Sequence, residues 1–138
     1  MMMLSDTSLL DIIMRDAPAS RVFDCYNREN SWFAKHKYEV ANEINENSMM
    51  VIHARNLSNG MTVEFPVKLH AIEFIDSGTS DIHSRIFVTF DPKVYDMKFR
   101  NNELCYEVFN NEKLNNFRLS YGTDYGQGHI LKAVCFFD

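Results

Sequence analysis

Hydrophobic and polar residues alternate most regularly in the segment 61–70. The apolar side comprises Met61, Val63, Phe65, Val67 and Leu69, and the polar side comprises Thr62, Glu64, Lys68 and His70. A period of two residues is typical of a β-strand that buries one face. Because Pro66 has no N–H to donate, we expect this strand to lie at a sheet edge or to contain a bulge. Beyond Leu69 the apolar positions shift by one residue, which predicts a bulge or a new strand near His70.

Turn signals and short apolar runs predict further strands at hairpin spacing. The expected strands are 49–55, 85–90, 95–100, 103–109, 117–121 and 129–137. The segment 56–60 ends in Asn-Gly, which accepts the positive φ that a tight hairpin requires. No helical pattern alternates with these strands, so they predict an antiparallel sheet rather than a doubly wound parallel one.

The first 30 residues indicate a helical region. Over 6–18, Ser5 or Asp6 can cap the free amides, and Pro18 ends the run. The apolar stripe of this helix comprises Leu9, Leu10, Ile12, Ile13 and Met14. Residues 19–30 carry a weaker helical spacing.

Two periods compete in the segment 32–46. Alternation from Trp32 to Ile44 predicts a strand, and we adopt this interpretation because the alternation is long. A helix remains open, with a stripe that Lys37 interrupts. That stripe comprises Phe33, Val40, Ala41 and Ile44.

These elements predict an α+β fold that is mainly antiparallel β. We expect a single domain, 1–138, with a short N-terminal helical region (1–30) and a meander of about 7–8 strands (31–138). The meander would form a curved sheet, a sandwich or a partial barrel. A chain of 138 residues can bury a core large enough to fold without a metal or a disulfide.

The amino-acid composition is that of a globular domain and argues against several other classes of protein. Hydrophobic residues make up 46% of the chain and charged residues 24%, as in globular domains. The net charge of −5 argues against a general nucleic-acid binder. The three cysteines are widely separated, so we expect them to be buried apolar residues rather than a disulfide framework or a zinc ribbon. These are Cys25, Cys105 and Cys135.

The sequence carries no predicted targeting or membrane segment. Its start lacks the basic and apolar regions of a signal peptide, and no apolar run approaches the roughly 20 residues that span a bilayer. We therefore expect a cytoplasmic protein that is not secreted and does not bind a membrane.

Three glycines in the stretch 119–138 raise the question of a phosphate-binding loop. Gly122, Gly126 and Gly128 match neither the P-loop nor the dinucleotide-binding spacing. We interpret this stretch as a turn between the last two strands. Its polar and aromatic residues make it a candidate partner-contact loop. They are Tyr121, Asp124, Tyr125 and His129.

The five histidines form neither H-x-x-x-H nor H-E-x-x-H, so we predict no metal site, no cofactor and no catalytic residues. If the strands 49–55 and 61–70 pair, however, His53 and His70 become neighbours, with Glu64 and Glu73 as possible carboxylate partners. The candidate ligand site of an alternative hypothesis, a small-ligand-binding or hydrolase-like protein on a curved sheet, comprises His53, Glu64 and His70.

Since no catalytic constellation emerges, we favour a non-enzymatic protein-interaction module that binds a partner or itself. The chain has 13 asparagines and 3 prolines, a bias typical of AT-rich genomes such as those of large phages. It would then be a virion subunit or an inhibitor of a host protein. A second alternative is a single-stranded nucleic-acid binder, based on interleaved basic and aromatic residues. These are Arg85, Phe87, Tyr95, Lys98, Phe99 and Arg100.

Overall fold

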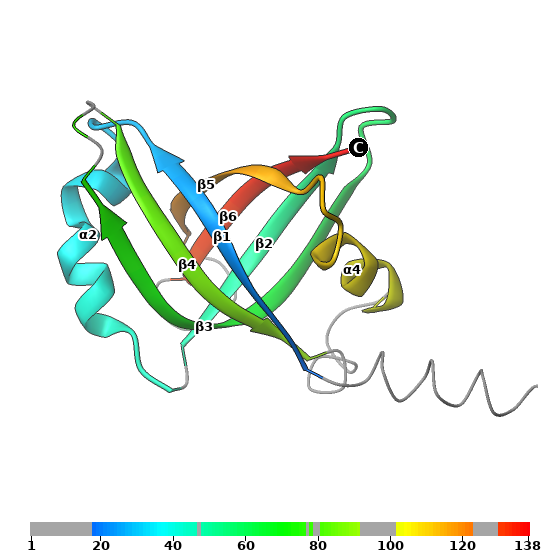
Figure 1. Ribbon diagram of the computed structural model, residues 1–138, viewed down its shortest axis with the longest axis horizontal. Coiled ribbons are helices and arrows are strands. Elements are labelled where there is room, and N and C mark those ends of the chain that lie inside the picture. The colour runs from blue at the N-terminus through cyan, green and yellow to red at the C-terminus, as the bar shows by residue number, and fades with distance from the viewer. Residues whose placement is uncertain (1–17, 47, 77, 79–80, 92–101, 123–129) are drawn as a thin grey trace, which may run out of the picture.

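The described residues form a closed β-barrel with two helices (Figure 1). The computed structural model describes residues 18–46, 48–76, 78, 81–91, 102–122 and 130–138. Their elements are β1 (Ala19–Asn27), α2 (Trp32–Glu43), β2 (Met49–Asn56), β3 (Thr62–Ile75), β4 (Ile82–Phe90), α4 (Asn102–Phe109), β5 (Asn115–Gly122) and β6 (Ile130–Phe137). The predicted class, α+β with mainly β structure, is confirmed at this coarse level.

The strands follow the order β1-β4-β3-β2-β6-β5 around the barrel. Four neighbouring pairs are antiparallel, whereas β2 runs parallel to β6 and β1 runs parallel to β5. The predicted meander is therefore wrong in its connections, and the sheet is closed rather than open or partial. The predicted count of 7–8 strands is also wrong, since the described residues form six.

Residues 19–27 form strand β1, although the sequence predicted them within the helical region 1–30. Phe23, Cys25 and Asn27 are buried, and the residues between them face outward. This alternation is masked in the sequence because the inner Asn27 is polar while the outer Val22 and Tyr26 are hydrophobic. Residues 6–17 of the predicted helix lie outside the described residues.

Helix α2 replaces the strand predicted over 32–46. It begins after Ser31, whose hydroxyl accepts a hydrogen bond from the Ala34 amide at 3.1 Å. Phe33 is buried, whereas Trp32 and Tyr38, counted as inward residues of a strand, are 41% and 66% exposed. The helical alternative was therefore the correct one.

Helix α4 replaces the strand predicted over 103–109. Cys105, Val108 and Phe109 are buried at the i, i+3, i+4 spacing of a helix face, and Leu104 is exposed. The helix lies at one end of the barrel (Figure 1). The Phe109 ring centroid lies 5.6–6.3 Å from three aromatic rings of the barrel core. These belong to Phe23, Phe65 and Phe90.

Strand β3 contains the bulge that the shift in parity predicted, between Leu69 and Ala71. The predicted hairpin before it is also confirmed, with Gly60 at a φ of +75°. Pro66 lies in this strand opposite Val51 of β2. Among the described residues, pairing of β3 with β4 begins only at Lys68. Pro66 therefore occupies a locally one-sided stretch of the barrel wall, where its missing N–H costs little.

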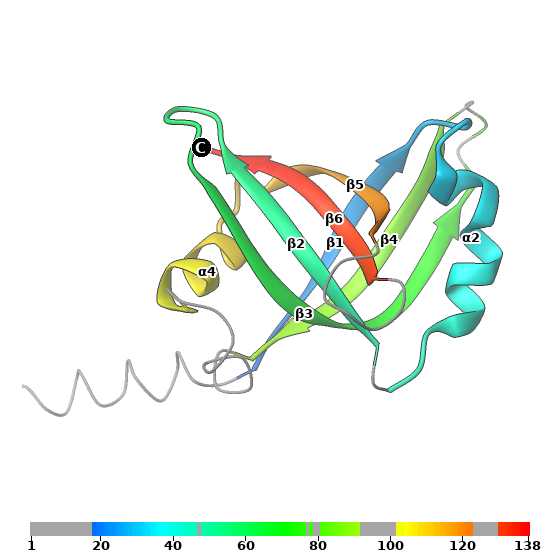
Figure 2. The same ribbon diagram turned by 180° about the vertical axis from the view of Figure 1, so that it is seen from behind.

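The barrel interior is filled by side chains. The largest fully buried ones are Phe33, Phe65, Phe90, Phe109, Phe117, Met50, Ile52, Ile86, Val67, Val88, Cys25 and Cys105. Interiors of this kind are close-packed. Any binding chemistry of the described residues therefore belongs to the outer surface. Strands β1 and β4 form the front wall in Figure 1, and β2 and β6 form the front wall in Figure 2.

Candidate functional site

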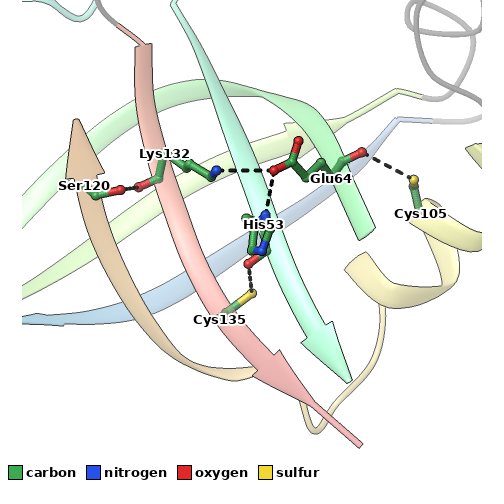
Figure 3. A network of polar contacts seen from close by, with 6 residues as sticks. All are labelled: His53, Glu64, Cys105, Ser120, Lys132 and Cys135. Carbon is green, nitrogen blue, oxygen red and sulfur yellow. Dashed lines mark hydrogen bonds and ion pairs between the residues drawn. The ribbon is translucent and has the colours of Figure 1, made fainter. Parts of the chain in front are cut away.

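Three polar side chains meet on the outer wall formed by β3, β2 and β6 (Figure 3). Glu64 Oε1 lies 2.6 Å from His53 Nδ1 and 3.2 Å from Lys132 Nζ. His53 and Glu64 are direct partners in the β2–β3 register. Lys132 is opposite Val51, so its side chain crosses β2 to reach Glu64. The structure thus brings together His53 and Glu64, two of the three residues named for the alternative hypothesis.

The wall behind this cluster is closed. Ile52 and Phe65, adjacent in the chain to His53 and Glu64, point inward and have no exposed surface. Buried thiols lie near the backbone carbonyls of the pair: Cys135 Sγ is 3.8 Å from the His53 oxygen, and Cys105 Sγ is 3.9 Å from the Glu64 oxygen (Figure 3). The cluster joins three strands at the surface and does not line a ligand cavity within the barrel.

The Glu64 carboxylate is already engaged by two donors. A carboxylate held this way is a poor general base, because proton uptake would break charge-assisted hydrogen bonds. The side chains of His53, Glu64 and Lys132 are 28%, 37% and 33% exposed, so solvent screens their interaction. The geometry favours cross-strand attachment rather than acid–base chemistry.

His70 does not join this cluster. It lies at the β3 bulge, and its Nε2 is 2.8 Å from Thr89 Oγ1 of β4. The Thr89 oxygen is in turn 3.2 Å from Ser20 Oγ of β1. The structure therefore separates His70 from His53 and Glu64, because β3 carries it to the wall shared with β4 and β1.

All three cysteine side chains are buried, as the sequence predicted. Burial raises the pKa of Cys105 to about 11 and that of Cys135 to about 12. Burial also raises the pKa of Cys25, with smaller contributions from Asp24 and Cys135. Because thiolates are the reactive form of cysteine, these thiols are unsuited to nucleophilic chemistry near neutral pH.

The predicted contact loop remains a prediction. Tyr121 belongs to β5, opposite Leu131 in the β5–β6 register. Asp124, Tyr125 and His129 lie outside the described residues.

The basic and aromatic set of the nucleic-acid alternative is only partly described. Arg85 and Phe87 lie on β4, and the other four residues fall outside the described ranges. Arg85 Nε lies 3.4 Å from Asp24 Oδ1 of β1, so an acidic side chain accompanies this cation.

A groove follows the line where β1 meets β5, which we call the seam groove. Its volume is about 320 Å³. Its lining residues are Arg21, Val22, Phe23, Asp24, Tyr26, Leu114, Asn116 and Phe117. Val22 and Tyr26 are hydrophobic yet 50% and 45% exposed. They flank Asp24 on the outer side of β1, beside the hollow.

Arg21 is one of the residues that line the seam groove. Its Nη1 donates to the Phe109 and Asn111 carbonyls at the end of α4, the second at 3.2 Å. Its guanidinium carbon lies 4.4 Å above the Phe23 ring. Burial lowers the pKa of Arg21, which Glu112 partly offsets. Arg21 is thus committed to holding α4 against β1.

Sequence reasoning missed both the seam groove and Lys132. The outward positions of β1 gave the only available signal, since Val22 and Tyr26 are spaced as hydrophobic residues on one strand face. That signal was read as helical spacing. Lys132 could not be found because its contact with Glu64 depends on the parallel pairing of β2 with β6.

Further features of the described residues restrict the chemistry. In these ranges, no group of three or more His, Cys, Asp and Glu residues could hold a metal ion. Neither described helix is long and apolar enough to cross a bilayer. Comparison of the chain with protein-family models, with curated proteins and with solved structures gives no match.

Proposed function

We propose that this protein is a non-enzymatic interaction module that binds a protein partner through the seam groove and the adjoining outer face of β1. The observation that carries this proposal is the groove itself, with Val22 and Tyr26 half-exposed beside a hollow of about 320 Å³. Protein interfaces use such apolar and aromatic anchors, which release ordered water when a partner covers them.

The wall beside the groove supports this proposal. Val22 lies opposite Phe87 of β4, and the Tyr26 ring contacts the His83 ring edge-on at 4.5 Å. Between these two rows Asp24 faces Arg85. The surface therefore presents apolar, charged and aromatic rows in succession, which suits a specific contact better than a uniformly polar wall.

Within this proposal the protein is encoded by a phage and acts in the cytoplasm, either as a virion subunit or as an inhibitor of a host protein. The support is an amino-acid composition that is rich in Asn and poor in Pro, as is typical of AT-rich genomes, together with the state of the reactive side chains. The thiols are buried, the Glu64 carboxylate is occupied, and the barrel interior is packed with side chains.

Two double variants test the proposal. Val22→Ser with Tyr26→Ser alters the seam groove, and Leu57→Ser with Met61→Ser is the matched control on the β2–β3 hairpin, where both residues are also exposed. Each protein is used as bait in extracts of cells in which the gene is native, and light scattering gives its oligomeric state. We expect one partner, or self-association, to persist in the control and to be lost in the groove variant. Equal recovery with all three proteins, or a strict monomer with no partner, contradicts the proposal.

A further inference from the structure

The seam groove exists because β5 departs from β1. Asn116 has a φ of +57°, and the β5–β6 register shifts between Asn115 and Arg118. A bulge of this kind bends its strand. Among the described residues, β1 and β5 pair only at Cys25 and Phe117. On the groove side of that pair, the segment 19–24 has a described ladder with β4 alone.

On the other side of that pair a side chain completes the seam. The Asn27 amide nitrogen donates to the Leu119 carbonyl at 2.6 Å, and the Leu119 amide donates to the Asn27 oxygen at 3.1 Å. A primary amide thus forms the two hydrogen bonds that a neighbouring backbone would form. For the segment 19–24, by contrast, no such hydrogen bonds to β5 are described.

We infer that the seam groove accepts an extended segment of a protein partner, which adds as a strand along the first half of β1. This inference rests on the proposed function and names its partner class. Strand addition combines main-chain hydrogen bonds with pockets for alternate side chains. On the open half of β1 the alternate outward residues are Val22 and Asp24. They select a segment in which an apolar side chain is followed, two residues on, by a basic one.

The charges around Asp24 favour a basic residue at the matching position of the partner segment. In the register of this wall, Arg85 lies between Asp24 of β1 and Glu73 of β3, so the row carries a net charge of −1. The contact between Arg85 and Asp24 is long, at 3.4 Å, and their side chains are 45% and 65% exposed. Such surface pairs are weak, and a partner cation can join them. The net charge of −5 for the whole chain acts in the same direction.

The test is a titration of the whole ¹⁵N-labelled protein with two capped peptides, followed by NMR. The probe is Thr-Val-Thr-Lys-Thr-Val-Thr, and the control is Thr-Val-Thr-Glu-Thr-Val-Thr. We expect the probe to shift amide resonances of 21–24 and 116–117. At low salt it should bind about fivefold more tightly than the control. Asp24→Asn should reduce this ratio to about one.

Val22→Thr should weaken probe binding by about fivefold, because it removes apolar contact while keeping a β-branched side chain. Leu57→Thr, on the hairpin between β2 and β3, should leave binding unchanged. The spectrum of each free variant shows whether it is folded. Should Val22→Thr unfold the barrel, Asp24→Asn alone tests the inference. This variant removes a charge at an exposed position, so it should leave the barrel folded.

Shifts confined to another surface, equal binding of the two peptides, or no shifts at millimolar probe would overturn strand addition of a basic segment. Concentration-dependent shifts at 21–24 without peptide would show that a second copy occupies the groove, which also overturns it. The peptide titration tests strand addition of a basic segment, whereas the bait experiment with the Ser variants tests whether the groove binds a partner at all. Failure of the inference can therefore be distinguished from failure of the proposed function.

Discussion

Asn27 is the residue on which closure of the barrel depends most directly. It is 5% exposed and its side-chain amide forms both hydrogen bonds to Leu119. A buried polar group stabilises the fold only while its hydrogen-bond partners are present. Removing the Asn27 amide would leave the Leu119 N–H and carbonyl without those hydrogen bonds. Asn27 could not be recognised from the sequence, because a polar residue at an inner position resembles the end of a strand.

We predict that Asn27→Ala lowers the free energy of unfolding by about 2–4 kcal/mol, since the Leu119 amide and carbonyl both lose a partner. Urea denaturation at equilibrium measures the change. Asn45→Ala, at an exposed position after α2, is the control and should stay within about 0.5 kcal/mol of the wild type. A wild-type midpoint for Asn27→Ala would show that the seam does not depend on this amide.

The buried thiols predict how stability varies at alkaline pH. A thiol whose pKa is raised in the folded state stays protonated there, while the unfolded chain loses that proton above its ordinary pKa of 9.0. The contribution of these thiols to the free energy of unfolding is therefore fully present below pH 9. It is lost as the pH rises toward about 11 for Cys105 and about 12 for Cys135. The limiting slope for one thiol is about 1.4 kcal/mol per pH unit.

Comparing unfolding of the wild type and Cys135→Ala at pH 8 and pH 10.5 isolates one thiol. The variant is less stable at both values because it leaves a cavity, but it should lose about 1–2 kcal/mol less between them. Identical pH dependence of the two proteins would mean that Cys135 is not protected from ionisation by burial.

The cluster of His53, Glu64 and Lys132 on the β3-β2-β6 wall predicts a small effect on stability. Glu64→Gln removes the carboxylate that His53 and Lys132 share, yet solvent reaches all three side chains. We expect a loss below about 1 kcal/mol in urea denaturation, which shrinks further in high salt. Glu39→Gln, exposed on α2, serves as the control. A loss above about 2 kcal/mol that is insensitive to salt would contradict this account of the cluster.

At the level of elements, helix α4 stabilises the barrel by inserting one aromatic ring. Phe109 has no exposed surface and lies against the rings of Phe23 and Phe90. Arg21 then holds the end of this helix through the Phe109 and Asn111 carbonyls. The helix is only eight residues long, so it depends on this packing rather than on its own propensity.

We predict that Phe109→Ala costs about 3–5 kcal/mol, the range for truncating a buried aromatic residue. This is a large share of the stability of a small domain. Thermal unfolding followed by circular dichroism measures it, and Leu104→Ala on the exposed side of α4 provides the comparison. A similar midpoint for the two variants would show that α4 packs on the barrel without supporting it.

Sequence patterns predicted strands β2, β3, β4, β5 and β6, and missed β1 and both described helices. Even the β3 bulge followed from a change of parity near His70. Strand β1 was missed because its outer side is hydrophobic, and α2 because Trp32 and Tyr38 are aromatic but exposed. Exposed hydrophobic residues distort the periodicity on which such predictions rest.

The candidate site was predictable only where it depends on neighbours in sequence. The pairing of His53 with Glu64 follows from a hairpin whose turn is visible in the sequence. The seam groove and the contact of Lys132 require the parallel pairs β1–β5 and β2–β6, which join residues far apart along the chain. Periodicity in one segment carries no information on which distant segment lies beside it.

At the level of the whole molecule, the two walls of the barrel carry different chemistry. The β2–β6 side, in front in Figure 2, holds the cluster of His53, Glu64 and Lys132, which ties strands together. The β1–β4 side, in front in Figure 1, carries exposed Val22 and Tyr26 beside the seam groove. The residues of the proposed binding surface are therefore separate from the contacts that tie β2, β3 and β6 together.

The position of β6 between β2 and β5 has a consequence for synthesis on the ribosome. The five other strands are translated before Ile130, yet the cylinder cannot close until β6 has left the exit tunnel. Until then β2 and β5 each expose a row of unpaired backbone groups toward the missing strand. Such open edges are templates for wrong pairing between nascent chains. Folding of this barrel is thus completed after translation of its last strand, and chaperones that shield strand edges should matter most in that interval.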